Sequence, residues 1–512
     1  MLREMARKTV PWYLPTYFEV ILICAFLAFG KQVTSYDLWW HLACGDEFWK
    51  RGLVMTTDDL STGSMGAYWT PHYWGWAVIG YQIYVRGGLL ALLLAKAALA
   101  AFTVQVLGWL LREQGVRHPA AFLVTVLVGI AGLFSQFWNL RAQSATGFGV
   151  FWITYLFARA RRTGRLPWIV APVTMCLWTN LHGGFIFGIV TWGAYFAAAC
   201  LRKLGGRPTP LAPGPLLGLG ALMVAACAIN PYGPQYILYP FSYLGNVHLQ
   251  TRITEWAGTV VRDYISLEIV ILVTLVACAL VPHASRLEEV GLAAICLHFV
   301  FQAARNIFLV GPWLSPLVGP RVDHLVEQVL ATPDAGEAPA PHIPAPHFPA
   351  PDIFTTPMLT TPMPTEAPIG KDRVAWAWCA IALITVIKLG IGYQPPVRSD
   401  HPVKIVEWLK TNDVPKAFFN EYAQGGYVMF HLRGRYLPYV DGRADLHIDS
   451  GAFVEYTKLI DLREDWETVF FKTRGFRSAL LEKGMPIGPA LRARGWKQVG
   501  PDEPNFELLV AP

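Results

Sequence analysis

The sequence predicts a polytopic α-helical membrane protein that carries a small α/β domain at its C-terminal end. Three observations support this fold class. Hydrophobic residues make up 54% of the 512-residue chain and charged residues only 15%, whereas soluble domains carry about 25% charged residues. Long apolar runs follow one another as far as residue 391, and the mean hydropathy is +0.35. Beyond residue 395 the charge rises and the apolar runs become short, as in a soluble domain.

The apolar runs predict about 11 transmembrane helices, since about 20 apolar residues span the hydrocarbon core of a bilayer. The first run follows a basic N-terminus with Arg3, Arg7 and Lys8, and no small-residue cleavage site comes after it. It is therefore expected to be a retained signal anchor with a cytoplasmic N-terminus. The predicted spans cover residues 16–31, 87–111, 119–135, 143–159, 166–181, 184–201, 212–229, 266–282, 287–303, 307–320 and 374–391.

Residues 72–85 are apolar and aromatic but too few for an ordinary crossing. We expect a re-entrant segment there, with a short span or an interfacial helix as the alternatives. This choice places the basic loops 160–165 and 202–211 in the cytoplasm, in agreement with the positive-inside rule. The long first external loop, residues 32–71, then lies on the extracytoplasmic side together with most of the unusual polar residues.

Composition divides the chain into four parts. Residues 1–331 are expected to form a transmembrane module, and residues 332–371 a linker whose proline content favours extended conformations. Residues 372–394 contain the last transmembrane helix, and residues 395–512 a soluble α/β domain outside the membrane. Within this domain, alternating patterns predict helices at 403–410 and 465–476 and strands at 417–420, 435–440, 478–482 and 506–510.

Several functional classes lack support in the sequence. The eight cysteines form no CxxC pair, so neither a disulfide framework nor a zinc site is indicated. The net charge of +6 is explained by short basic loops and requires no nucleic acid as a partner. The chain has no Walker loop, GxSxG elbow, HExxH helix or dinucleotide fingerprint, so ATP-driven transport and soluble-type hydrolysis are not indicated.

The most informative motif is the run from Tyr36 to His41, directly after the first predicted span. Ionisable groups at the edge of a bilayer are costly unless they have a partner or a function. Asp37 can act as a general base towards a hydroxyl group placed within hydrogen-bond reach. His41 is expected to orient Asp37 or to bind a sugar. The alternative is that Trp39 and Trp40 anchor the segment at the interface.

Four further residues are candidates for binding a phosphate or sugar. Arg141 and Arg305 lie beside apolar runs on the external side, where a guanidinium can bind phosphate in a planar fork. Their alternative role is to reach the lipid headgroups. Asn180 and His182 precede two glycines, which allow a close backbone approach. A polar turn between two spans would explain this pair equally well.

Three residues are candidates for the acceptor side. Glu255 lies in an external loop and either lines an acceptor site or is simply solvated. Asp441 and Arg443 follow a predicted strand in the C-terminal domain, where polar loop residues often serve function. The alternative for Asp441 and Arg443 is that they pair with each other.

Three motifs carry a resemblance to a known superfamily. They are D-x-W-W-H-x-x-x-G from Asp37 to Gly45, W-x-N-x-H-G from Trp178 to Gly183, and GGY…DGR-x-D over Gly425–Tyr427 and Asp441–Asp445. With its many predicted spans and external domain, the chain resembles the GT-C superfamily of membrane glycosyltransferases. It looks most similar to a group of uncharacterised bacterial GT-C-like proteins.

The resemblance implies transfer of a sugar from a polyprenyl-phosphate-linked donor to a glycan, lipid or protein acceptor. The expected place is the extracytoplasmic face of a bacterial inner membrane, with Asp37 as the catalytic base. No cofactor is expected with certainty and no metal-binding residue is assigned, because Leu38 stands where many GT-C members have a second acidic residue; a divalent metal stays an open alternative. The alternative function is a non-catalytic transporter or assembly factor. The lack of a clear internal repeat favours the enzyme.

Overall fold

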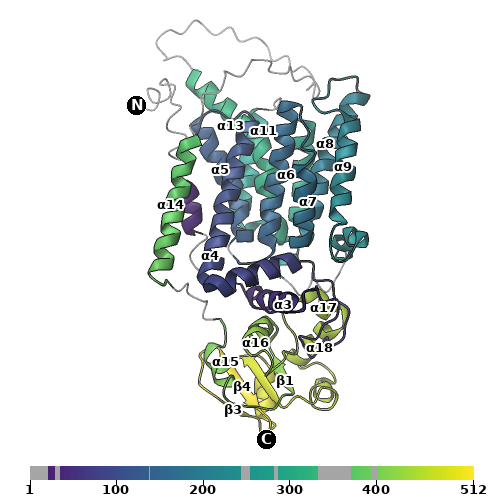
Figure 1. The fold of residues 1–512 in the computed structure, drawn as a ribbon, viewed down its shortest axis with the longest axis vertical. Coiled ribbons are helices and arrows are strands. Elements are labelled where there is room, and N and C mark those ends of the chain that lie inside the picture. The colour runs from purple at the N-terminus through teal and green to yellow at the C-terminus, as the bar shows by residue number, and fades with distance from the viewer. Residues whose placement is uncertain are drawn as a thin grey trace.

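The computed structural model describes residues 21–28, 35–137, 139–243, 254–281, 286–331, 371–393 and 400–512. A bundle of long helices stands on a small α/β domain (Figure 1). The helices of the bundle are α4 (Trp74–Glu113), α5 (Pro119–Phe137), α6 (Gln143–Thr163), α7 (Val170–Leu181), α8 (Ile186–Leu204), α9 (Pro213–Cys227), α11 (Ile265–Leu280), α12 (Leu287–Gln302), α13 (Val310–Ala331) and α14 (Lys371–Gly390). The predicted linker falls almost wholly outside the described residues, as does much of the first predicted span.

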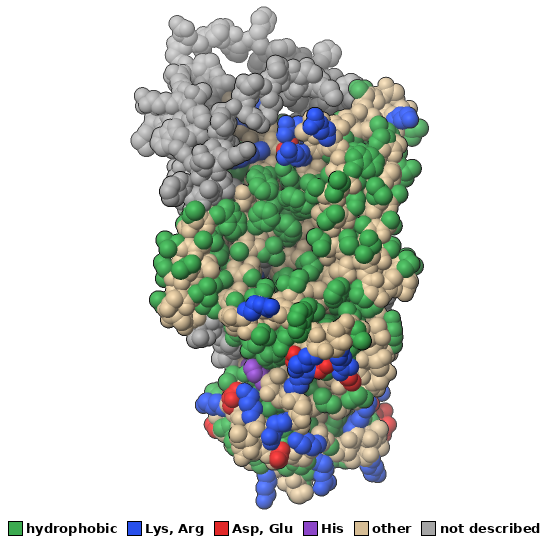
Figure 2. Space-filling view, in the orientation of Figure 1, with side chains coloured by type: hydrophobic (Ala, Val, Ile, Leu, Met, Phe, Trp, Pro, Cys, Tyr) green, Lys and Arg blue, Asp and Glu red, His purple; other side chains and the backbone are tan. Residues whose placement is uncertain are grey.

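The surface of the bundle fits a bilayer. Its outer face exposes large apolar side chains such as Leu272, Leu275 and Val386. Figure 2 shows charged side chains over the α/β domain and at the opposite end, with a mostly hydrophobic face between them. Two described helices, Trp74–Glu113 and Gly183–Leu204, have the length and apolar composition needed to span a membrane, and five other apolar helices are shorter. The expected number of about 11 spans is therefore supported only in part.

The first external loop contains a helix that the sequence prediction missed. Helix α3 covers Asp37–Arg51 and lies across the end of the bundle (Figure 1). Its charges suit the helix dipole, with Asp37 in the first turn and Lys50 and Arg51 in the last. Gly52 ends it in the left-handed conformation at φ 67°. The helix was missed because its many aromatic and buried residues obscure the helical period.

Of the segment 72–85, residues 74–85 form the start of helix α4 and do not re-enter the bundle. This first part of α4 lies beside α3 across the bundle end, and the chain then turns into the bundle (Figure 1). The bend is at Gly87 and Gly88, where the φ/ψ values are non-helical. Gly88 has φ 62° and ψ −160°, a conformation that is strained for other residues. The interfacial alternative describes this segment better than the expected re-entry.

The C-terminal domain is built around a four-stranded sheet in the order β1-β2-β4-β3. β1 pairs parallel with β2, whereas β4 pairs antiparallel with both of its neighbours. The strands are β1 (Phe418–Asn420), β2 (Ser478–Glu482), β3 (Lys497–Val499) and β4 (Phe506–Val510). Its helices are α15 (Val403–Leu409), α16 (Gly425–His431), α17 (Ala444–Asp449), α18 (Ala452–Ile460), α19 (Ile487–Arg492) and the π-helix η7 (Thr468–Thr473).

The strand predicted at residues 435–440 is wrong. This segment has no regular secondary structure and joins no strand of the sheet. Instead, the carbonyl oxygens of Pro438 and Tyr439 accept hydrogen bonds from the backbone of Thr62 and Gly63, each at 2.9 Å. Its backbone groups are therefore satisfied by the first external loop, a contact between distant parts of the sequence that local propensity does not reveal.

Helix α3 joins the bundle to the C-terminal domain. Trp39 packs among residues of both parts, and its indole nitrogen donates to Nε2 of His401 at 3.1 Å. Trp40 lies against Gly426 of α16, where an added Cβ would be 3.1 Å from the Trp40 backbone nitrogen. The two indoles therefore anchor a protein domain, and they place the start of α3 between that domain and the bundle.

Candidate active site

The structure brings Asp37, Arg141 and Glu255 together at the start of α3. Arg141 lies in the turn between α5 and α6, and Glu255 belongs to the short 3-10 helix η3 (Thr254–Trp256). The Nε atom of Arg141 is 2.9 Å from Oδ2 of Asp37, and Nη1 donates to Oε2 of Glu255 at 2.8 Å. A single guanidinium thus bridges two carboxylates from separate segments.

Arg305 completes this cluster from the short helix η5 (Ala304–Leu309). Its Nη1 atom is 4.0 Å from Oε1 of Glu255, and its guanidinium carbon lies 4.0 Å from the centre of the Trp256 ring. The side chain is 19% exposed. Arg305 thus places a planar guanidinium, which is a group that can bind an anion, beside Glu255 and Trp256.

The two oxygens of Asp37 differ in their contacts. Oδ1 accepts a hydrogen bond of 3.2 Å from the indole nitrogen of Trp40. Towards Oδ2, the Arg141 Nε–H is close but poorly directed, so this contact is an ion pair without an aligned hydrogen bond. Oδ2 thus keeps a lone pair that can accept a proton, and the side chain is 20% exposed.

Burial and the nearby arginines shift the pKa values of the two carboxyl groups in opposite directions. Burial raises the pKa of Asp37 above its ordinary value and the nearby Glu255 adds to this, while Arg141 and Trp40 oppose it. For Glu255, burial also favours the neutral form, but Arg141 and Arg305 outweigh it and the net pKa is lowered. The site therefore holds one carboxylate that stays ionised and one with increased basicity, which is the property of a general base.

His41 does not contact the carboxylate of Asp37. Its Nδ1 atom is 2.7 Å from the backbone oxygen of Asp37, and its ring stacks on Trp40 with a centroid distance of 3.6 Å. Burial lowers the pKa of His41 to about 3, so the ring is neutral. Its Nε2 atom is buried without a hydrogen-bond partner among the described residues.

The C-terminal domain covers Asp37 from the other side. A Cβ added to Gly442 would lie 2.8 Å from Oδ1 of Asp37, so this glycine allows the close approach. Tyr422 also faces the cluster: its hydroxyl pKa is raised by burial, and then by the charges of Asp37 and other acidic residues. Sequence reasoning missed Tyr422 and Gly442, although Gly442 lies within the DGR-x-D motif and Tyr422 lies three residues before the GGY motif.

A second polar group lies next to the cluster. Nδ1 of His72 is 3.0 Å from the hydroxyl of Tyr239, in the 3-10 helix η2 (Pro234–Tyr243), and that hydroxyl donates to Asp445 at 3.0 Å. Burial lowers the pKa of His72 to about 3, and the positive charge of Arg305 contributes. The group joins the start of α4, the bundle and the C-terminal domain.

The side chains of Asn180 and His182 form hydrogen bonds within the bundle. The Asn180 side chain accepts from the Trp74 indole at 3.0 Å and donates to two backbone oxygens, which ties α7 to α4 and α9. Nδ1 of His182 contacts the Thr146 hydroxyl at 2.7 Å and accepts from the Gly184 backbone at 3.0 Å. The centre of its ring lies 5.7 Å from the centre of the His72 ring, so His182 is a neighbour of the second polar group.

Asp441 and Arg443 are fully buried and pair with each other, as the structural alternative expected. Arg443 also binds Asp58 of the first external loop at 2.7 Å, and its guanidinium lies 4.8 Å from the Trp69 ring. The charges of Arg443 and His447 outweigh burial and hold the pKa of Asp441 well below its usual range. Both residues thus fix the domain to the loop.

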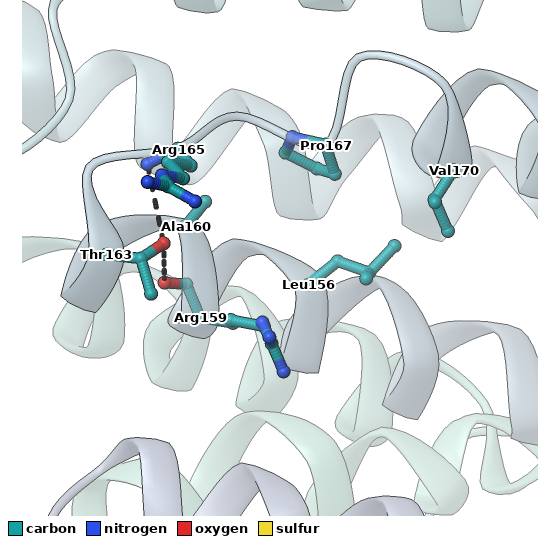
Figure 3. Close-up of a pocket in the computed structure, with 7 residues that line it drawn as sticks. All are labelled: Leu156, Arg159, Ala160, Thr163, Arg165, Pro167 and Val170. Atoms are coloured by element: carbon teal, nitrogen blue, oxygen red, sulfur yellow. Dashed lines mark hydrogen bonds between the residues drawn. The ribbon is translucent and has the colours of Figure 1, made fainter.

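Two further features lie away from Asp37. A shallow hollow of about 400 Å³ is lined by Arg159, Arg165 and neighbours at the far end of α6 (Figure 3); this helix of 21 residues is about 30 Å long.

Among the described residues, one group has suitable ligand atoms for a divalent metal, namely His118, Asp323 and Glu327, within 4.8 Å of one another. This group joins the start of α5 to α13.

No protein-family model and no curated protein matches the chain. Solved structures of the archaeal oligosaccharyltransferase AglB from Archaeoglobus fulgidus do match. The complex with an inhibitory peptide and a dolichol-phosphate has a TM-score of 0.56 at 10% identity, covering 92% of this chain and 70% of that chain. The complex with Zn and sulfate has a TM-score of 0.54 at 11% identity, covering 91% and 68%.

A third AglB structure, tethered to an acceptor peptide containing the NVT sequon, has a TM-score of 0.56 at 9% identity, covering 92% of this chain and 69% of that chain. At such low identity the likeness shows the fold. This chain has the fold of the oligosaccharyltransferase AglB. The resemblance inferred from the motifs is therefore confirmed for the fold, whereas kinship with the bacterial group stays a prediction.

Proposed function

We propose that this protein transfers a sugar from a polyprenyl-phosphate-linked donor to an acceptor hydroxyl or amide at the outer surface of a membrane. The observation that carries the proposal is the position of Asp37. Its side chain is 20% exposed, and its Oδ2 atom has no aligned hydrogen-bond donor among the described residues, while Arg141 and Arg305 belong to the same cluster. The glycosyltransferase fold adds support.

The proposed reaction proceeds with inversion at the anomeric carbon. Asp37 takes the proton of the acceptor group, and the acceptor atom forms the new bond to the anomeric carbon. The bond from that carbon to the phosphate oxygen breaks, and the lipid phosphate leaves with the electron pair. Arg305 stabilises the departing phosphate, because its guanidinium stays positively charged and its side chain is 19% exposed beside the carboxylates of the cluster.

The decisive experiment is a transfer assay with purified protein in lipid vesicles. It uses a panel of radiolabelled polyprenyl-phosphate sugars and membrane extract as the source of acceptors. We expect Asp37→Asn to abolish transfer, and Asp59→Asn to leave it unchanged, since Asp59 is exposed and forms an ion pair with Arg51 at the end of α3. Equal transfer by the wild type and Asp37→Asn would remove Asp37 from the mechanism.

We also propose that the protein resides in the inner membrane of a bacterium, with its N-terminus in the cytoplasm and its C-terminal domain outside. The basic residues Arg161, Arg162 and Arg202 lie at the bundle end opposite α3, which supports this orientation. An impermeant thiol reagent applied to spheroplasts should label Asp502→Cys and spare Lys203→Cys. The reverse pattern would contradict the proposed orientation.

A further inference from the structure

Arg141 occupies the position between two carboxylates where a metal enzyme would hold its cation. Asp37 comes from α3 and Glu255 from η3, and their side chains converge from separate parts of the fold. Arg141 contacts the first at 2.9 Å and the second at 2.8 Å. Converging carboxylates are the usual ligands of hard divalent ions, so the occupant of this position defines the chemistry of the site.

The charges of the cluster balance without a metal. Asp37 and Glu255 supply two negative charges, and Arg141 and Arg305 supply two positive ones. A divalent ion between the carboxylates would add two positive charges within a few ångströms of a guanidinium that cannot lose its proton. Entry of the ion would therefore require Arg141 to leave both of its partners.

The surroundings of Asp37 leave little room for a coordination sphere. Oδ1 already accepts from the Trp40 indole, and Gly442 of the C-terminal domain lies against the same oxygen. Magnesium ions usually keep several waters in a near-octahedral arrangement, and calcium ions bind six to eight oxygen atoms. The planar fork of arginine fits the gap because it meets two carboxylates along two edges.

We infer that Arg141 replaces a divalent cation in this site, and that sugar transfer by this protein needs no metal at Asp37. The inference rests on the proposed function. Arg141 positions Asp37 and lowers the cost of its ionisation, while the proposed function assigns Arg305 to the lipid phosphate. One structure of similar fold is a complex with Zn and sulfate, so metal binding at Asp37 is the alternative that the test below must exclude. A metal bound at His118 and Asp323 would occupy a different site from Asp37, because that group joins α13 to the start of α5.

The test measures metal binding as well as activity, with the full-length protein in lipid vesicles. Mn²⁺ binding is followed by electron paramagnetic resonance for the wild type, Arg141→Ala, and Arg141→Ala combined with Asp37→Asn. Mn²⁺ bound at His118 would be common to all three and cancels in the differences. We expect Arg141→Ala to bind one additional Mn²⁺ that the double variant loses. We expect wild-type transfer to continue in EDTA.

Two further variants secure the interpretation. Arg141→Lys keeps the charge but loses the fork, and we expect it to exclude Mn²⁺ while transfer falls about 100-fold. Arg86→Ala, an exposed arginine of the first part of α4, should behave as the wild type. Loss of wild-type transfer in EDTA with recovery in Mn²⁺, or wild-type Mn²⁺ that disappears in Asp37→Asn, would overturn the inference and leave the glycosyltransferase proposal intact. Absence of transfer under every condition would count against the proposed function, and the Mn²⁺ measurements would still decide the role of Arg141.

Discussion

Arg443 and Asp58 lie 385 positions apart in the sequence and form a fully buried ion pair of 2.7 Å. Arg443 also donates to both carboxylate oxygens of Asp441, from Nε to Oδ1 at 2.8 Å and from Nη2 to Oδ2 at 2.7 Å. The first external loop and the C-terminal domain are thus joined by one guanidinium. Arg443 also follows Gly442, the residue that lies against Oδ1 of Asp37, so this ion pair fixes the part of the domain that covers Asp37.

Replacing Arg443 with Ala should separate the domain from the loop. The change leaves two buried carboxylates without their partner, and breaking a buried pair in this way costs about 3–5 kcal/mol. We expect a lower melting temperature and faster proteolysis between residues 52 and 73. Arg463→Ala is the matched control, because its ion pair with Asp461 is exposed. Equal melting temperatures for the two variants would show that Arg443 does not hold the domain.

Replacing Trp40 with Phe should shift the pH dependence of transfer. The indole hydrogen bond lowers the pKa of Asp37, so its removal raises that pKa further. A base works only when ionised, so activity is lost as the pH falls through its pKa. The acidic limb of the pH–rate profile should therefore move to higher pH in Trp40→Phe. Trp49→Phe, on the same helix but 58% exposed, should leave the limb in place; a shift in both variants would exclude the hydrogen bond as its cause.

Replacing Arg305 with Ala should weaken the stabilisation of the departing phosphate. Loss of one charge-stabilising donor typically lowers kcat by about 10²–10³-fold. We expect a fall of that size with a smaller change in KM, because the phosphate gains charge during the reaction. Arg51→Ala removes an exposed arginine of α3 and should have little effect. A change confined to KM would instead assign Arg305 to ground-state binding of the donor.

Glu421 should make stability depend on pH. Burial raises its pKa to about 7, although its carboxylate accepts hydrogen bonds from the backbone of Ala423 and Gln424. The folded protein therefore binds a proton that the unfolded chain releases above a pH of about 4.3. Stability from this group is greatest below that value and declines as the pH rises to about 7, by up to about 3 kcal/mol.

Thermal unfolding of Glu421→Gln over the same pH range tests this expectation. The variant should lose that part of the pH dependence and should unfold at a higher temperature than the wild type at pH values above about 7. Glu467→Gln, whose carboxylate is more than half exposed, is the control and should follow the wild type. An unchanged slope in Glu421→Gln would show that another group binds the proton.

Much of the architecture could be predicted because it depends on local sequence. Apolar runs identified the bundle, and strands β1, β2 and β4 were anticipated from short patterns of apolar residues. The segment at 435–440 was assigned wrongly because its partner is the first external loop rather than the sheet. Helix α3 was missed, although the acid–base spacing of Asp46–Lys50 and Glu47–Arg51 is a helical signal.

The candidate site was predictable in its members but not in its pairing. Asp37, Arg141 and Arg305 were singled out because charged groups beside apolar runs are unusual. Glu255 was assigned to the acceptor side, whereas the structure places it between the two arginines. Asn180 and His182 were expected to meet a ligand; in the structure Asn180 accepts from Trp74 of α4 and His182 contacts Thr146 of α6, and their ligand-binding role stays a prediction.

The sequence by itself determined that this protein has a membrane-type composition, a separate C-terminal domain and a charged cluster at the start of α3, since these follow from local hydrophobicity and charge. Only the tertiary structure decided which charges meet. The pairing of Arg141 with Asp37 and Glu255, and of Arg443 with Asp58, joins residues more than a hundred positions apart. Such contacts depend on how helices and loops pack, and the cost of burying a charge then selects the partner that each one must have.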